Sequence, residues 1–262
     1  MHRLLTALVL CLSTAALADL TMVSETVSGG KTRTVTLSTK ANKAYFELQE
    51  ADAPLRTMMR DADSKQLFLV DHAKKVITVI TEADSKALEL KQAQFRAQMQ
   101  AQLEKMAPEQ RARAESTMLG VGLAEAKPAV FTFDKKKGAA RKVNGFSCQD
   151  YVIKREGKVH GEGCFMTWKD TGLTADEFKA TMLRAMPTGA TSGPMAGAFE
   201  GQASAPGFPV YRKLVDDTGA VTSETTLKSL TKTALGADKF ELPRDYTQRS
   251  VGAVMGGPAR KE

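Results

Sequence analysis

Residues 146–168 read FSCQDYVIKREGKVHGEGCFMTW and predict a β-hairpin. Two stretches rich in β-branched and aromatic residues, 146–154 and 158–168, flank the loop Arg155-Glu156-Gly157. A three-residue loop that contains glycine is a common connection between antiparallel strands. A loop of this length would place Cys148 directly opposite Cys164 on the neighbouring strand.

The cysteines of this hairpin predict a disulfide. The chain has three cysteines, and Cys11 lies in an N-terminal segment that we expect to be removed. Opposed side chains in an antiparallel pair come within reach of a disulfide, so we expect Cys148 and Cys164 to be bonded. A redox-catalytic role is the alternative, but the sequence has no C-x-x-C motif and no helix N-terminus that would lower a thiol pKa.

The N-terminal segment, residues 1–18, reads MHRLLTALVLCLSTAALA and is typical of a signal peptide. A basic start is followed by the apolar run Leu4–Leu12 and by an A-x-A cleavage pattern that ends at Ala18. The run is shorter than the roughly 20 residues that a membrane span needs. We therefore expect an exported protein without a transmembrane segment after cleavage, in the periplasm first and outside the cell as the alternative. An uncleaved N-terminal anchor is the competing interpretation.

The rest of the chain predicts a mainly β protein of the α+β class. Alternating polar and apolar residues predict many short strands joined by turns, which favours a mostly antiparallel sheet. The expected strands are 21–28, 31–38, 43–50, 54–60, Gln66–Val70, Val76–Thr81, Val130–Asp134, Ala139–Val143, the two hairpin strands, Val210–Asp216 and Val221–Ser229.

Two or three helices are expected in the same sequence, and two of them have capping patterns. Thr81 with Asp84 would cap a helix from about Ala83 to Met106, and Thr174-Ala175-Asp176-Glu177 forms a capping box for a helix from Ala175 to about Met186. We expect one domain over 19–249, with a helical insertion at about 83–119. A flexible loop rich in Gly, Ala, Ser and Pro at 187–207 and a disordered tail at 250–262 complete the organisation.

Several short segments resemble the exported bacterial proteins grouped as domain of unknown function 4412 (DUF4412). They are Leu67–Val70 with Asp71 and the Lys75 turn, Lys142–Phe146 before Cys148 and Tyr151, Gly207–Val210, and Phe240–Tyr246. The resemblance extends over about 40–247 and contains no catalytic signature. It implies a fold like that of the lipoprotein carriers LolA and LolB, a large incomplete antiparallel β-barrel whose open side two or three helices cover. It implies no enzymatic activity.

Apolar side chains on the expected helices are candidates for binding a lipophilic ligand. Flexible methionine side chains adapt to varied apolar ligands, and a half-closed barrel must cover its apolar face with helices or with a ligand. The candidate ligand-binding residues are Phe95, Met99, Phe178, Met182 and Met186. Core packing is the alternative role for these side chains.

A metal site is the less favoured candidate. His160, Asp150 and Glu162 would share one face of the expected hairpin, and imidazole and carboxylate groups bind divalent transition metals. A solvent-facing strip of paired charges is the alternative. His72 is expected to be a solvated turn residue, and the basic cluster at 135–142 is expected to be a solvated turn or a site for a polyanion.

The sequence lacks the motifs of common enzymes, including a G-x-S-x-G elbow, H-E-x-x-H and a Walker loop. We therefore expect a non-enzymatic, exported binder of a lipid, a lipoprotein acyl chain or an envelope protein, without a cofactor. The alternative is a structural or protein-interaction module with a plugged barrel, and a metal-dependent enzyme is the third hypothesis. An exported location and the absence of interleaved aromatic residues argue against a nucleic-acid partner. The sequence does not define the oligomeric state.

Overall fold

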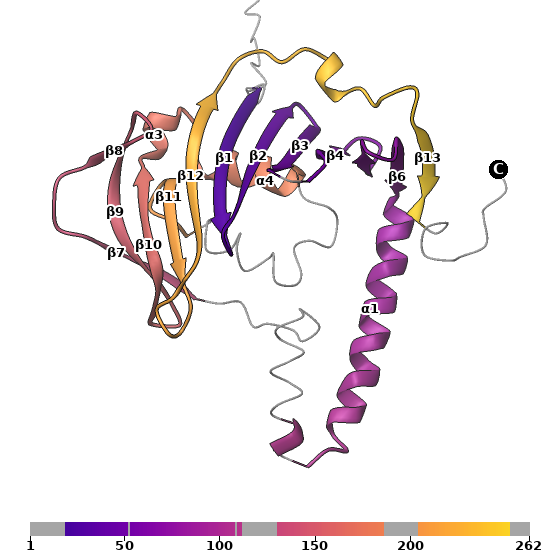
Figure 1. Cartoon of the computed structure of the whole chain (residues 1–262), viewed down its shortest axis with the longest axis horizontal. Coiled ribbons are helices and arrows are strands. Elements are labelled where there is room, and N and C mark those ends of the chain that lie inside the picture. Colours follow the sequence, from indigo (N-terminus) through magenta and orange to yellow (C-terminus); the bar gives the residue numbers. More distant parts are fainter. Residues whose placement is uncertain (1–18, 52, 108, 112–129, 186–203, 252–262) are drawn as a thin grey trace, which may run out of the picture.

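The computed structural model describes residues 19–51, 53–107, 109–111, 130–185 and 204–251 (Figure 1). The expected signal peptide and most of the expected loop and tail therefore lie outside the described residues. Ser250, the first residue of the expected disordered tail, ends a β-strand instead. None of the helices in the described ranges is long and apolar enough to cross a membrane.

One large sheet organises the fold. Its order is β13-β6-β5-β4-β3-β2-β1-β12-β11-β10-β9-β7, with β8 paired to β9 beside this path. The strands are β1 Leu20–Ser28, β2 Lys31–Lys40, β3 Lys43–Glu50, β4 Arg56–Asp61, β5 Gln66–Asp71, β6 Val76–Ile80, β7 Phe131–Lys135, β8 Arg141–Val143, β9 Phe146–Arg155, β10 Lys158–Met166, β11 Phe208–Val215, β12 Val221–Thr231 and β13 Thr247–Ser250.

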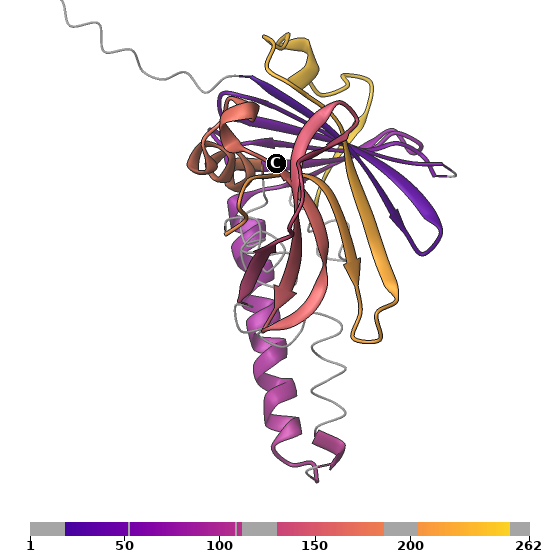
Figure 2. The same cartoon turned by 90° about the vertical axis from the view of Figure 1, so that its left-hand side faces the viewer.

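The sheet confirms the expectation of a mainly β, incomplete barrel. Neighbouring strands pair antiparallel except for β13, which runs parallel to β6. Among the described strands β13 and β7 lie at opposite ends of the order and do not pair, so the sheet curves without closing (Figure 2). The first strand, β1, pairs with the late strand β12, and this pairing joins the two halves of the chain.

The helices differ in what they cover. The short helix α3 (Trp168–Thr171) and α4 (Ala175–Ala185) pack on one side of the sheet (Figure 2). The long helix α1 (Glu82–Leu103) has the expected capping box between Thr81 and Asp84, but it projects away from the sheet (Figure 1). Two helices therefore cover the sheet, and α1 is an extension from β6. Between β12 and β13 the chain forms the short 3-10 helix Asp238–Phe240.

Two apolar clusters hold these elements together. The larger one joins α4 to the centre of the sheet, and the smaller one joins β4, β5 and β6 to the C-terminal segment. The buried members of the larger cluster are Leu20, Leu37, Ala44, Cys148, Cys164, Met166, Leu173, Phe178, Met182, Phe208, Val210 and Leu227. Those of the smaller cluster are Met59, Phe68, Val70, Ile77 and Phe240.

Candidate functional site

Helix α4 is fixed on the sheet by its N-terminal residues. The Thr174 side chain accepts a hydrogen bond from the Glu177 backbone N–H, and the Glu177 carboxylate accepts one from the Thr174 N–H. This reciprocal pair is the expected capping box. Leu173 and Phe178 flank the box, and both are buried in the larger cluster. The cap thus sets where Phe178 and, one turn later, Met182 meet the sheet.

An aromatic group lies between α4 and the sheet. Trp168 of α3 contacts Phe178, with ring centroids 5.5 Å apart, and Phe208 of β11, with centroids 6.1 Å apart. Phe178 and Phe208 also contact each other in an edge-to-face arrangement, with centroids 5.1 Å apart. Edge-to-face pairs stabilise beyond their apolar burial. Trp168 is the one tryptophan of the chain, so its fluorescence reports on this group.

A cavity of about 180 Å³ lies beside these aromatic residues, between α4 and strands β1, β11 and β12. Its apolar wall combines residues from all four elements, namely Met22, Phe178, Met182, Phe208, Pro209 and Leu227. An apolar cavity of about 150 Å³ is known to hold a benzene molecule. The cavity therefore has room for an apolar group of that size or slightly larger.

One side of the cavity is polar. Arg212, Thr225 and Thr26 occupy facing positions on β11, β12 and β1, because Arg212 pairs with Thr225 and Thr225 pairs with Thr26. All three line the cavity, together with Ser24 and Tyr211. The Thr26 and Thr225 hydroxyl groups are hydrogen-bonded to each other at 3.0 Å. The cavity thus has an apolar end and a polar end.

The expected ligand-binding residues divide into two groups. Phe178 and Met182 line the cavity, with 5% and 9% of their surface exposed. Phe95 and Met99 lie on α1 and do not line it, and Phe95 is 45% exposed. Met186 lies outside the described residues. The structure therefore brings together only the two candidates from α4.

The three expected metal ligands do not form a metal site. Glu162 is ion-paired with Lys136, and Asp150 is ion-paired with Arg141 at 3.0 Å. The imidazole of His160 instead contacts the ring of Phe131. Within the described ranges, no group of three His, Cys, Asp or Glu residues could hold a metal ion.

His160, Asp150 and Glu162 do not come together because the register of the hairpin differs from the expected one. Glu156 and Gly157 both have positive φ, at 51° and 77°, and they form a two-residue loop between β9 and β10. A further shift between Val159 and Gly161 leaves His160 as an extra residue in its strand. Together these two features pair Cys164 with Asp150, and not with Cys148.

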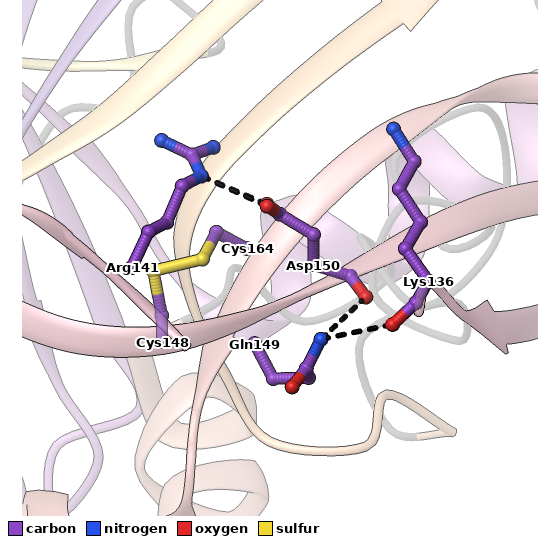
Figure 3. The surroundings of a disulfide bond; sticks show 6 residues. All are labelled: Lys136, Arg141, Cys148, Gln149, Asp150 and Cys164. Carbon is purple, nitrogen blue, oxygen red and sulfur yellow. Dashed lines mark hydrogen bonds and ion pairs between the residues drawn. A yellow bond between two sulfur atoms is a disulfide. The ribbon is translucent and has the colours of Figure 1, made fainter. Parts of the chain in front are cut away.

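The disulfide forms despite the changed register. Cys148 and Cys164 are bonded, with their Cα atoms 5.3 Å apart, so the predicted bridge is confirmed although the residues are diagonal neighbours. Figure 3 shows Arg141 and Asp150 beside the bridge, with the Gln149 amide donating to the Lys136 carbonyl oxygen. Lys136 and Arg141 thus belong to ion pairs, and the basic cluster is partly neutralised.

His160 lies at the far end of the same hairpin. Partial burial lowers its pKa, and the charge of Arg155 lowers it further. Asp217 has the opposite effect on this pKa. The structure therefore favours the neutral imidazole of His160.

His72 has a structural role that the sequence analysis missed. Its Nε2 is 3.0 Å from the Thr57 hydroxyl, and its Nδ1 is 3.0 Å from the Tyr246 hydroxyl. Lys75 in the same turn is ion-paired with Asp245. The turn thus fastens the C-terminal segment to β4 and β5. The segments around Asp71 and Phe240–Tyr246, which resemble DUF4412 in sequence, contact each other at this turn. Their contacts stabilise the fold.

The chain shows low similarity to solved structures. One is an uncharacterized conserved protein from Thermus thermophilus, with a TM-score of 0.43 and 8% identity over 89% of this chain and 90% of that chain. Another is the Pseudomonas aeruginosa MucA/MucB complex, with a TM-score of 0.40 and 10% identity over 88% of this chain and 58% of that chain. No curated protein sequence matches this chain.

The family comparison is more informative. The model of the family described as "Domain of unknown function (DUF4412)" matches residues 126–246. The match begins later than the resemblance found in the sequence, which extended from about residue 40. It contains the disulfide hairpin, α4, β11 and β12, and hence most of the cavity wall. Residues 126–246 of this chain are thus similar to DUF4412, as the sequence segments indicated.

Proposed function

We propose that this protein is an exported, non-enzymatic binder of a lipophilic ligand. The observation that carries the proposal is the cavity beside α4, whose wall includes Met22, Phe178, Met182, Phe208 and Leu227. Apolar walls with a few polar groups at one side are typical of small-molecule sites. An acyl chain of a lipid or lipoprotein fits this chemistry.

The affinity can be estimated from the size of the cavity. A group of about six carbon atoms, close to benzene in size, would fill it, since benzene occupies an apolar cavity of about 150 Å³. At about 0.8 kcal/mol for each buried methylene, its burial would contribute about 5 kcal/mol. Part of this is offset by the lost motion of the ligand, so we expect a Kd of about 1 mM for a short apolar chain.

Export is supported by two observations. Residues 1–18 have the pattern of a cleaved signal peptide, and a structural disulfide joins Cys148 to Cys164. Disulfides persist in oxidising compartments and are rare in the cytosol. The periplasm is the compartment that we propose.

Fluorescence of Trp168 tests the binding proposal. Octan-1-ol in the cavity would contact Phe178 and Phe208, the two rings that Trp168 touches. We expect a saturable change in emission with a midpoint of about 1 mM, from the estimate above.

A pair of variants separates binding in the cavity from binding elsewhere. Met22→Phe would fill part of the cavity and weaken octanol binding. Val27→Phe adds the same ring at an exposed position of the same strand, outside the cavity, and should leave the binding unchanged. Equal binding by both variants, or a linear response without saturation, would contradict the proposal.

A second candidate function, a protein-interaction module, is favoured by α1. Leu88 and Phe95 of α1 are exposed although they are large and apolar, and with Met99 they follow a stripe at steps of seven and four residues. This spacing is typical of a helix that packs against another helix. Sedimentation velocity would detect self-association of the protein, and Phe95→Glu should abolish it. A monomer at all concentrations would remove self-association as the role of this stripe.

A further inference from the structure

Arg212 lies at the polar side of the cavity, in the middle of the sheet. It pairs with Gly163 on β10 and with Thr225 on β12, and Thr225 pairs with Thr26 on β1. None of these strands lies at an end of the sheet order. Arg212 is partly buried, and it lines the same cavity as Met22, Phe178 and Leu227.

Arg212 has no charged partner in the described part of the chain. None of the ion pairs there includes it, whereas Lys228 on the neighbouring strand β12 is paired with the Glu25 carboxylate. Burial lowers the pKa of the Arg212 guanidinium, and no carboxylate opposes that shift. A desolvated cation without a partner is unfavourable, and buried charges in proteins are usually paired.

The surroundings of Arg212 add hydrogen-bond donors. Thr26 and Thr225, which follow Arg212 across the neighbouring strands, and Ser24 carry hydroxyl groups and also line the cavity. The Thr26–Thr225 hydrogen bond occupies only one hydroxyl hydrogen of the pair, so one remains free to donate. Arginine binds carboxylates and phosphates through two parallel hydrogen bonds, which lysine cannot reproduce.

We propose that the cavity takes an anionic amphiphile, whose carboxylate or phosphate head lies at Arg212 and whose apolar chain lies among Met22, Phe178 and Leu227. This inference rests on the proposed function and names the class of ligand. The head group would supply the negative charge that the described residues do not. A fatty acid and a phosphorylated alkyl chain share this chemistry.

Comparison of ligands with one chain and different heads tests this inference. Octanoate, octyl phosphate, octan-1-ol and octyltrimethylammonium would be titrated into the full mature protein with Trp168 emission as the signal. A hydrogen bond to a charged group contributes enough that at least one anionic ligand should bind about tenfold or more tightly than octan-1-ol. Octyltrimethylammonium should bind more weakly than octan-1-ol. The tighter of the two anions identifies the head group.

Variants of Arg212 assign the preference to this side chain. Arg212→Gln should weaken binding of the preferred anion by about tenfold, and should weaken octan-1-ol binding much less. Arg212→Lys keeps the charge and should keep a smaller preference for the anion. Arg244→Gln, at an exposed site outside the cavity, is the matched control and should behave as the wild-type protein.

The outcomes separate this inference from the proposed function. If octan-1-ol binds and neither anion binds more tightly, the inference fails and the proposed function stands. If none of the four ligands binds, both fail. If Arg212→Gln does not fold, as judged by circular dichroism, the ligand preference of the wild-type protein and of Arg212→Lys still decides the question.

Discussion

Loss of the Cys148–Cys164 disulfide is expected to lower the free energy of unfolding by about 3 kcal/mol. The bridge joins residues that are 16 positions apart, and the chain entropy of a loop of about that length corresponds to about 3 kcal/mol. Both cysteines belong to the larger apolar cluster, with 3% and 0% of their surface exposed. The bridge therefore constrains the unfolded chain between two side chains that are buried in the folded protein.

Urea unfolding, followed by Trp168 fluorescence, measures this effect. The oxidised protein would be compared with the reduced protein and with the double variant Cys148→Ala/Cys164→Ala. The reduced protein keeps both sulfur atoms, so its loss of stability reports the bond alone, and the variant adds the loss of two buried side chains. Reductant should have no effect on the double variant.

The reasoning would be refuted by a reduced protein as stable as the oxidised one. Extrapolated unfolding free energies carry an uncertainty of about 10–15%, so a change of about 3 kcal/mol is measurable. A loss that appears in the double variant and not on reduction would show that packing of the two side chains, and not the covalent bond, stabilises this hairpin.

Three further predictions concern pH, packing and the C-terminal segment. Burial lowers the pKa of His160 in the folded protein, so below about pH 6.5 the unfolded chain binds more protons than the folded protein does. The free energy of unfolding should therefore fall as the pH is lowered through this range. His160→Gln should flatten this part of a curve of stability against pH. Gly207→Ala should destabilise the protein by more than about 1 kcal/mol in urea unfolding, since a Cβ atom at this position would lie 2.2 Å from the Met166 carbonyl oxygen. Tyr246→Phe should cost about 1 kcal/mol, through loss of the hydrogen bond to His72, and should speed hydrogen exchange of the β13 amides.

The sequence predicted the local elements of this fold well. Period-two alternation located β1, β2 and β3 to within two residues at each end, and two capping patterns located the starts of α1 and α4. These features depend on residues close together in the chain. The parallel strand β13 was missed, because four mostly polar residues carry no alternating pattern and its partner β6 lies far away in sequence.

The hairpin shows where local rules fail. A three-residue loop was the natural expectation, because a two-residue loop requires Glu156 in the left-handed region, which costs a non-glycine residue about 1–2 kcal/mol. The observed loop and the extra residue at His160 each shift the register by one position. The shift removes the expected alignment of His160 with Asp150 and Glu162, and it leaves the two cysteines near enough to bond.

Only some of the residues that line the cavity could be predicted from the sequence. Phe178 and Met182 were recognised because they lie on one apolar helix face. Met22, Arg212 and Leu227 were not, because the pairing of β1 with β12 brings together strands about 200 residues apart. A single sequence carries no signal for such a pairing.

A crystal structure of the protein with 8-bromooctanoate would test the central claim most directly. The proposed function predicts anomalous bromine density inside the cavity, between Phe178 of α4 and Met22 of β1, and the further inference predicts that the carboxylate is directed towards Arg212. Bromine density at another site, or an empty cavity at saturating ligand concentration, would contradict it.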